Sequence, residues 1–431
     1  MQKTPSIAFV TLGCPKNEVD TDRMRARVLG SAYQLSEDPI HADVVVVNTC
    51  SFISEATEES IGAVLALSAR EPGERERKIV VAGCMPARYS DELPGLLPET
   101  AAFLPVADES SLLTVLEQVT GVASRARKDA ATRTVTGGTA YLQISDGCHR
   151  ACSYCTIPAI RGPYVSRPLD EILAEVRELV GLGAREIVLI GQDITAYGRD
   201  LAAHDTLADV VRGVASVDGV EWLRLMYVQP DGISDELLAA IAEHENVVRY
   251  LDIPLQHASE GVLRSMRRSG GSAAFLELLE RIRTALPGVV LRTTVIAGHP
   301  GETRSDSAEL LRFLEAAYFD YVGVFAYSPE EGTVSAGLPD QVPARTRRAR
   351  AQRVRDAADV IGVASVAARV GDVLEVLVEG MDEEEGAVVG RWRGQAPEID
   401  GLVLLDRGES GQLVAARIVD SIGYDLEGEV L

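Results

Sequence analysis

The sequence lacks the features that would indicate a membrane, secreted or nucleic-acid-binding protein. No apolar run of roughly eighteen residues occurs, so no membrane-spanning helix is predicted. The start, MQKTPSIAFVTLG, has one lysine and too short an apolar run for a signal peptide, which favours the cytoplasm. Basic residues are few: 42 Lys and Arg oppose 65 Asp and Glu, giving a formal net charge of −23. Such a polyanion is repelled by nucleic acids, so we expect a basic protein partner and no direct nucleic-acid binding.

Cysteine is also scarce, and in the cytoplasm its commoner roles are metal binding and catalysis. Three of the six cysteines, Cys148, Cys152 and Cys155, form a C-x3-C-x2-C array within Ser145–Pro158. Three thiolates can hold a 4Fe–4S cluster and leave one iron open, and an open position is typical of catalytic metal sites. The spacing resembles the signature of the radical S-adenosylmethionine (radical SAM) enzymes. The alternative is a zinc knuckle with His149 as fourth ligand, although no second C-x2-C pair is present.

The other three cysteines each follow a predicted strand in the first hundred residues. Cys14, Cys50 and Cys84 come after Ile7–Leu12, Val44–Val47 and Ile79–Ala82. Helical stretches between these strands, of which Glu55–Ala69 is the clearest, predict a small doubly wound parallel sheet. Ligands bind at the carboxyl edge of such sheets, so we expect the three thiols to converge on a second cluster. The alternative is that each is a separate buried thiol.

The central part of the chain alternates strands and helices more strongly. Six βα units predict a parallel, partly closed (β/α)6 barrel resembling a TIM barrel, with its chemistry on the loops after the strands. The predicted strands are Tyr141–Ser145, Glu186–Ile190, Trp222–Tyr227, Arg249–Ile253, Val289–Ala297 and Tyr321–Ala326. The predicted helices include Leu169–Leu182, Asp235–Glu243 and Asp306–Ala316. Polar or glycine-rich loops follow the later strands and predict a cofactor pocket there: Gly191–Asp193, Gln229–Asp231, Pro254–His257, Gly298–Glu302 and Tyr327–Glu330.

The carboxyl-terminal part changes to short alternating strands and predicts a small β-barrel. The four predicted strands are Val373–Val378, Ala387–Arg393, Gly401–Leu405 and Leu413–Val419. Residues Val366–Leu431 contain 15 acidic residues, five arginines and no lysine, a formal charge of −10. The preceding segment, Pro343–Arg355, is a basic helix, which we interpret as a solvated face rather than a nucleic-acid contact.

Several motifs together resemble the methylthiotransferase family over essentially the whole chain. They are TLGCPKN at Thr11–Asn17, GQDITAYG at Gly191–Gly198, MYVQP at Met226–Pro230, IPLQH at Ile253–His257 and YSPEEGT at Tyr327–Thr333. The resemblance implies an amino-terminal three-cysteine domain (1–122), a radical SAM core (134–365) and a TRAM domain (366–431). Two positions depart from the family pattern: Ala87 stands where Gln is common, and His299 where Phe is common.

The resemblance also implies the activity. It favours the branch that methylthiolates the β-carbon of an aspartate in small-subunit ribosomal protein twelve, giving 3-methylthioaspartate, over the branch that modifies adenosine in transfer RNA. The implied cofactors are two 4Fe–4S clusters and S-adenosylmethionine. The implied partners are that ribosomal protein, free or in the ribosome, and an electron donor such as flavodoxin or ferredoxin. A hypothesis of another class is a non-catalytic iron–sulfur module that binds ribosomes and senses redox state.

Site residues follow from the same resemblance, position by position. Cys148, Cys152 and Cys155 would hold the radical SAM cluster and be catalytic, and Cys14, Cys50 and Cys84 would hold an auxiliary cluster. Four further residues would bind S-adenosylmethionine: Tyr154 near the adenine, Gln192 near the methionine end, and Gly298 and Glu302 near the ribose and adenine.

Overall fold

The computed structural model describes residues 4–69, 77–125, 132–135, 137–382 and 386–431. These residues form two compact units. The first comprises Met1–Thr134, Asp146–Arg150 and Cys155–Val165; the second comprises Val135–Ser145, Ala151–Tyr154 and Ser166–Leu431. None of the helices in the described ranges is both long enough and apolar enough to cross a membrane.

The first unit is built on a five-stranded parallel sheet in the order β2-β1-β3-β4-β5. The three predicted strands are confirmed as β1 (Ser6–Thr11), β3 (Val44–Thr49) and β4 (Lys78–Gly83). The prediction missed the two edge strands, β2 (Gln34–Leu35) and β5 (Ala102–Pro105). Both are short and only partly buried, so neither has the continuous apolar run that identifies a central strand.

Helices cover both faces of this sheet, as its buried strand β3 requires. Val44 and Val46 contribute to one hydrophobic core, and Val45 and Val47 contribute to another on the opposite face. The helices of the unit are α1 (Pro15–Leu29), α2 (Ser54–Ser68), α3 (Cys84–Arg88), α4 (Leu93–Leu96), α5 (Leu112–Thr120) and α6 (Ile157–Arg161), with a 3-10 turn at Val106–Ser111.

The second unit contains a six-stranded parallel sheet whose strands lie side by side in chain order. The six predicted strands are confirmed as β6 (Thr139–Gln143), β9 (Glu186–Ile190), β10 (Trp222–Leu225), β11 (Val247–Asp252), β12 (Val290–Ala297) and β13 (Tyr321–Ala326). The short strands β7 (Ser145–Asp146) and β8 (Val165–Ser166) pair with each other. Parallel neighbours in this order are the product of repeated βα units.

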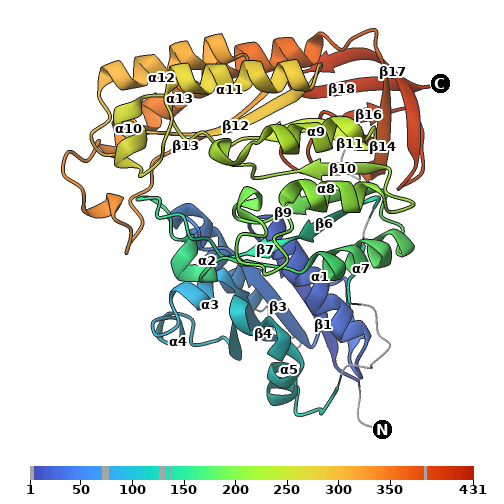
Figure 1. Ribbon diagram of the computed structural model, residues 1–431. Coiled ribbons are helices and arrows are strands. Elements are labelled where there is room, and N and C mark those ends of the chain that lie inside the picture. Colours follow the sequence, from blue (N-terminus) through green and yellow to red (C-terminus); the bar gives the residue numbers. More distant parts are fainter. Residues whose placement is uncertain (1–3, 70–76, 126–131, 136, 383–385) are drawn as a thin grey trace. The chain divides into compact units, whose positions relative to one another are not determined.

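Helices pack against one face of this sheet and against one another. They are α7 (Leu169–Gly181), α8 (Leu207–Ala215), α9 (Asp235–Glu243), α10 (Glu260–Ser265), α11 (Ser272–Ala285), α12 (Arg304–Ala317) and α13 (Ala344–Ala367). Figure 1 shows α11, α12 and α13 running beside β12 and β13. Short 3-10 turns lie at Ile194–Ala196, Pro230–Gly232 and Ser335–Gly337. Alternate strand residues such as Leu189, Leu225 and Leu291 point into the core shared with the helices, which leaves the opposite sheet face for other contacts.

The carboxyl-terminal residues form a closed five-stranded barrel in the order β14-β15-β16-β18-β17. The four predicted strands are confirmed as β14 (Val373–Asp382), β15 (Ala387–Trp392), β16 (Val403–Leu405) and β17 (Leu413–Ile422). The prediction missed β18 (Asp425–Val430), which closes the barrel. Its sequence, DLEGEV, is too acidic and glycine-containing to be recognised as a strand from local preference alone.

Buried charges join this barrel to the parallel sheet within the second unit. Arg391 of β15 donates to Glu186 of β9 at 2.6 Å, and Arg224 of β10 donates to the other oxygen of Glu186 at 2.6 Å. All three side chains are fully buried. Asp400 accepts from Tyr250 of β11 at 2.5 Å and from Arg292 of β12 at 3.2 Å. The carboxyl-terminal barrel is therefore packed against the sheet as part of one folded body.

Helix α13 corrects one interpretation made from the sequence. Arg350, taken there as part of a solvated basic face, is buried and donates to Glu302 Oε1 at 2.9 Å. Arg345, Arg348 and Arg353 are exposed, as predicted. A helical periodicity places every third or fourth residue against the sheet, and Arg350 occupies that buried position between Arg347 and Val354.

Candidate functional site

Three cysteines of the first unit lie directly after neighbouring parallel strands. Cys14 is the N-cap of α1 after β1, Cys50 follows β3, and Cys84 opens α3 after β4. Because β1, β3 and β4 are adjacent and parallel, their carboxyl ends bring these residues to one edge of the sheet. The three cysteines therefore follow strands that end at the same edge of the sheet, and their convergence on a cluster stays a prediction.

Asn17, in the first turn of α1, links the trio at the level of side chains. Its Oδ1 accepts from Cys14 Sγ at 3.6 Å and lies 3.9 Å from Cys84 Sγ. Its Nδ2 donates to Leu12 O and to Thr49 O, the residue before Cys50, both at 3.0 Å. The buried amide thus holds the loops after β1 and β3 together and contacts two of the three thiols.

Glycines next to the trio permit this close approach. A Cβ on Gly13 would lie 2.6 Å from Cys50 Cβ, and Gly13 has a φ of +107°. A Cβ on Gly83 would lie 2.2 Å from Asn48 Oδ1, and Gly83 has a φ of +94°. Both a side chain and the required left-handed backbone would be unfavourable at these positions, so each glycine is needed where it stands.

Two of the three thiols, Cys50 and Cys84, lie in a buried environment that opposes their ionisation. Burial raises the pKa of Cys84 to about 12, with Arg161 opposing the shift and the neighbouring Cys14 and Cys50 adding to it. Burial likewise raises the pKa of Cys50, and Cys14 adds to that shift. Thiols of this kind are deprotonated by binding a metal rather than by solvent, because metal ligation stabilises the thiolate.

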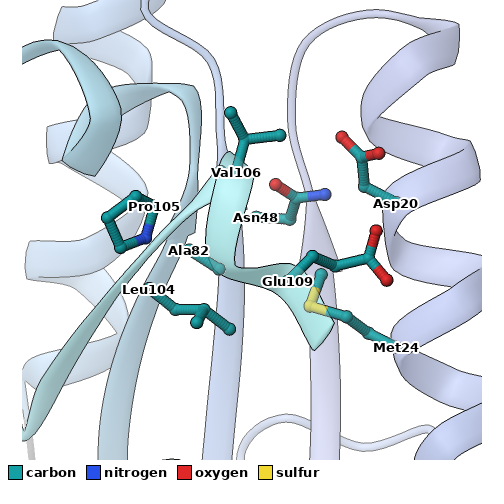
Figure 2. A pocket seen from close by; sticks show the side chains of 9 residues that line it. Asp20, Met24, Asn48, Ala82, Leu104, Pro105, Val106 and Glu109 are labelled. Carbon is teal, nitrogen blue, oxygen red and sulfur yellow. The ribbon is translucent and has the colours of Figure 1, made fainter. Parts of the chain in front are cut away.

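A small pocket in the first unit is lined by polar and apolar residues (Figure 2). Its volume of about 10 Å³ is of the order of one water molecule. Asp20, Asn48 and Glu109 supply its polar groups, and Asn48 Oδ1 is buried with no hydrogen-bond partner. Burial raises the pKa of Glu109 to about 7, and Asp20 contributes while Arg27, 3.6 Å away, opposes the rise.

The C-x3-C-x2-C array occupies the loop after β6 and β7, and its first and third cysteines belong to the first unit. Cys148 is buried, and its Sγ accepts from the Arg150 N–H at 3.3 Å. A Cβ on the preceding Gly147 would lie 2.1 Å from Pro163 O, which explains a glycine there. Cys155 precedes Thr156, whose hydroxyl donates to Phe52 O at 3.1 Å, two residues after Cys50.

The second cysteine of the array, Cys152, belongs to the second unit and has a cationic neighbour there. Arg268 lies 3.9 Å from Cys152 Sγ and donates to Gln229 Oε1 and Pro254 O, both at 2.8 Å. Gln229 and Pro254 are on loops after β10 and β11, in the set that the sequence identified as polar. Sequence reasoning missed Arg268, because its contacts depend on the folded arrangement of three loops.

His299, a departure from the family pattern, contacts this same part of the array. Its Nε2 lies 3.1 Å from Ser335 Oγ and 3.5 Å from Ser153 Oγ, and Ser335 Oγ donates to Ser153 Oγ at 2.9 Å. Burial lowers the pKa of His299 to about 4, so the ring is neutral at pH 7. The two serine hydroxyls are hydrogen-bond partners for the buried imidazole, so burial of this polar side chain does not leave it unpaired.

The four residues predicted to bind S-adenosylmethionine all lie on the second unit. Tyr154 and Gln192 are half-buried, on the array and on the loop after β9. Gly298 donates its N–H to Glu302 Oε2, and Arg350 donates to Glu302 Oε1. Glu302 is fully buried and lies 3.8 Å from His257 Nε2, so its carboxylate is engaged by protein groups and holds the loop after β12. Any contribution of Glu302 to a cofactor would act through the shape of that loop.

Each trio offers three thiols, and thiolates are the usual ligands of iron–sulfur clusters. His149, the fourth ligand of the zinc alternative, is exposed and its ring lies 6.3 Å from that of Tyr164. Within the described part of the chain, no group of three or more His, Cys, Asp and Glu side chains is arranged to hold one metal ion.

Comparison with protein families divides the chain into three matches. Residues 142–314 match the radical SAM superfamily, residues 6–104 match "Uncharacterized protein family UPF0004", and residues 370–431 match the TRAM domain. The three matches correspond to the two parallel sheets and the carboxyl-terminal barrel, in the order that the sequence predicts.

The chain also aligns over nearly its whole length with curated relatives. The chain is 42% identical over 439 aligned positions to "Ribosomal protein uS12 methylthiotransferase RimO" of Geobacter sulfurreducens, covering 99% of this chain and 98% of the relative. The protein of the same name from Geotalea uraniireducens gives the same identity and coverage. Among solved structures, the radical S-adenosylmethionine methyltransferase TsrM of Kitasatospora setae, with cobalamin and a 4Fe–4S cluster bound, aligns at a TM-score of 0.54 with 13% identity, over 90% of this chain and 87% of that one. At that identity the structural likeness supports the fold alone.

Proposed function

This chain belongs to the radical SAM methylthiotransferases of ribosomal protein uS12, and from that premise we propose that its six cysteines hold two 4Fe–4S clusters with separate tasks. Radical SAM membership brings one cluster and S-adenosylmethionine with it. The second cluster is our proposal. The observation that carries it is the approach of Cys14, Cys50 and Cys84 around Asn17, at the carboxyl edge of a parallel sheet.

We assign reductive cleavage of S-adenosylmethionine to the site of Cys148, Cys152 and Cys155. When bound there, a 4Fe–4S cluster with one open iron would supply the electron for reductive cleavage of S-adenosylmethionine. The Arg150 N–H donates to Cys148 Sγ and would orient this sulfur as a ligand. Arg268 places a positive charge beside Cys152, and Tyr154, Gln192 and the loop Gly298–Glu302 would shape the space for the cofactor.

The amino-terminal trio would hold the auxiliary cluster, whose open iron would carry the sulfur atom to be inserted. Asn17 would orient Cys14 and Cys84, and Gly13 would keep Cys50 close to the start of α1. Burial of Cys50 and Cys84, each less than a tenth exposed, would limit the access of water to a reactive sulfur species. The proposed product is 3-methylthioaspartate, formed at the β-carbon of an aspartate in uS12.

The proposed substrate agrees with the charge of the chain. A net charge of −23 attracts a strongly basic ribosomal protein and repels bare RNA. The carboxyl-terminal barrel, with 15 acidic residues and five arginines in Val366–Leu431, contributes much of that field. The cytoplasm is the proposed location, and flavodoxin or ferredoxin is the proposed class of electron donor.

Mass spectrometry of uS12 tests the function directly. After anaerobic incubation with reconstituted enzyme, reductant, sulfide and S-adenosylmethionine, we expect one aspartate to gain the mass of a methylthio group in place of hydrogen. Iron analysis should give about eight irons per chain and about half of that when either trio is changed to Ala. Methylthiolation of an adenosine in transfer RNA, with uS12 unmodified, would contradict the substrate; a full iron content in Cys50→Ala would contradict the second cluster.

A further inference from the structure

Arg161 ends the short helix α6 and reaches the amino-terminal trio, although no sequence motif pointed to it. The residue follows Cys155 by six positions within the first unit. Its Nη2 donates to Asp20 Oδ2 at 2.7 Å and lies 3.4 Å from Asn17 Oδ1 and 3.9 Å from Cys84 Sγ. One guanidinium therefore contacts a thiol of the trio and the amide that organises it.

One nitrogen of the Arg161 guanidinium, Nη1, makes no hydrogen bond within the described residues. The side chain is 2% exposed, and Nη1 lies 3.5 Å from the Asp146 carboxylate without hydrogen-bond geometry. A buried donor without an acceptor is costly, by about 1–3 kcal/mol, and is rare in folded proteins. Arg161 is thus hydrogen-bonded to Asp20 through Nη2, while Nη1 is ion-paired with Asp146 and makes no hydrogen bond within the described part of the chain.

We propose that Arg161 retains a small anion of sulfur, hydrosulfide or a thiolate, beside the amino-terminal trio. The inference rests on the proposed function, because it places this anion where the trio leaves a metal position open. Guanidinium is suited to the task since it stays charged when buried and donates several hydrogen bonds from one plane. Arg161 would act as a positioning residue for the sulfur that is inserted, while the six cysteines remain the cluster ligands.

The same position would affect the auxiliary cluster itself. Charge and hydrogen bonds near the sulfurs of a cluster raise its reduction potential, because they stabilise the more negative reduced state. Asp20 and Thr156 limit the movement of the segment that carries Arg161: Asp20 by the ion pair, Thr156 by its bond to Phe52 O at 3.1 Å. The segment therefore presents the cation in a fixed place rather than as a mobile surface charge.

The chain offers a matched control for a merely structural role. Arg133 is also buried, in the first unit, and pairs with Asp22 of the same helix α1 at 3.1 Å. Asp22 is two residues from Asp20, and Arg133 Nη2 donates to it, whereas Arg161 Nη2 lies 3.9 Å from Cys84 Sγ. Arg133→Gln thus removes a comparable buried ion pair on α1 while leaving the cation at the trio in place.

The experiment uses full-length protein in which Cys148, Cys152 and Cys155 are all Ala, so that only the auxiliary cluster is reconstituted. Arg161→Gln, Arg161→Lys and Arg133→Gln are compared in this background. Sodium sulfide is titrated while the electron paramagnetic resonance spectrum of the reduced cluster is recorded, and the midpoint potential is measured by redox titration. Iron content and circular dichroism verify loading and folding of each variant.

We expect Arg161→Gln to weaken sulfide binding about tenfold, the value of one charge-assisted hydrogen bond. Its reduction equilibrium should move about tenfold toward the oxidised form, about 59 mV for one electron. The sulfide affinity and midpoint potential of Arg161→Lys should lie between those of Arg161→Gln and the parent. Those of Arg133→Gln should equal the parent values. If Arg161→Gln fails to load iron, a shifted spectrum and potential in Arg161→Lys still support the inference.

Two results separate the inference from the proposed function. Unchanged sulfide affinity and potential in Arg161→Lys and in any Arg161→Gln protein that loads iron would overturn the role of Arg161 and leave the second cluster intact. If the parent background itself binds no cluster, while the protein with all six cysteines binds about four irons, the second cluster of the proposed function fails.

Discussion

Replacement of Arg391 by Met should detach the carboxyl-terminal barrel from the parallel sheet more than any exposed substitution in the same contact region. Arg391 is fully buried and donates to Glu186 and Glu379, each at 2.6 Å, and to Gln395 O at 2.9 Å. Burial alone would raise the pKa of Glu186, but Arg224 and Arg391 together hold it at about 2.

The expected loss of folding stability in Arg391→Met follows from the pKa of Glu186. A shift from 4.5 to about 2 corresponds to about 3 kcal/mol of stability, which is present above pH 4.5 and is lost as the pH falls through about 2. Without Arg391 the buried carboxylate of Glu186 keeps one cation, Arg224, at 2.6 Å. Breaking one side of a buried ion network costs about 3–5 kcal/mol, so we expect a loss near the lower end of that range at pH 7.

The chain carries a natural probe for this measurement. Its two tryptophans, Trp222 of β10 and Trp392 of β15, both lie in the region where sheet and barrel meet. Trp222 is fully buried and donates from Nε1 to Glu375 at 2.9 Å. Urea unfolding followed by tryptophan fluorescence therefore reports the separation of these two parts.

Arg393→Met is the matched control. Arg393 pairs with Glu375 at 2.9 Å in the same region, but the two side chains are 41% and 46% exposed. Exposed pairs contribute about 0–1 kcal/mol, so its urea midpoint should move little. Because Arg393 lies over the Trp222 ring, midpoints rather than intensities are compared. Equal shifts for the two variants, or none for Arg391→Met, would refute the role given to the buried network.

Three further outcomes are expected. Cys152→Ala should abolish formation of 5′-deoxyadenosine, whereas Cys84→Ala should retain some and yield no methylthiolated uS12; equal loss, with the other cluster intact by spectroscopy, would contradict separate tasks. Glu109→Gln should stabilise the apoprotein by about 3 kcal/mol at pH 8, because burial raises the pKa of Glu109 to about 7. That gain should disappear as pH falls toward 4.5, and a gain that is constant in urea unfolding from pH 4.5 to 8 would be inconsistent with it. His299→Phe should cost no more than about 1.5 kcal/mol, because Ser335 and Ser153 keep their own bond; a larger shift of the urea midpoint would mean that the imidazole is essential to the loop.

The sequence was sufficient to predict the three central strands of the first parallel sheet and all six strands of the second, because buried parallel strands have short apolar runs as their sequences. Val44–Val47 is buried throughout, and Glu186–Ile190 was predicted with its observed bounds. The edge strand Gln34–Leu35 and the closing strand Asp425–Val430 escaped prediction. Their place in the sheet is decided by neighbouring strands rather than by their own composition, which is neither apolar nor alternating.

The cysteines were also predictable, but the groups that organise them were not. The type and spacing of cysteines indicate metal binding in a sequence, whereas nothing in the sequence distinguishes Arg161 and Arg268 from other arginines. Arg161 meets Cys84 across 77 positions of chain, and Arg268 meets Cys152 across 116. Asn17 lay inside a quoted motif, yet its function as the shared partner of two thiols becomes visible only when the strands are adjacent.

The buried network also changes how substrate recognition should be tested. Deleting Val366–Leu431 would remove the acidic barrel, and it would also remove the partners of Arg224, Tyr250 and Arg292. A truncated protein would therefore lose stability in the sheet that carries the cofactor loops, and lost activity would not identify a substrate contact. Substitutions of exposed acidic residues on the barrel leave that network in place and change the charge alone.

The arginines of α13 support the proposed protein substrate over RNA, because three of them make contacts within the protein. Arg350 is committed to Glu302, Arg347 to Tyr327 O at 2.9 Å, and Arg355 to Val324 O at 3.1 Å. Binding that is dominated by phosphate contacts uses about 6–10 neutralised phosphates, and each requires an available cation. The exposed arginines remaining on this helix, Arg345, Arg348 and Arg353, are fewer than that, on a chain with a net charge of −23. Three of the six arginines in this basic helix thus make internal contacts, and the remaining three are too few to offset the negative charge of the chain, which agrees with the proposed cationic protein substrate.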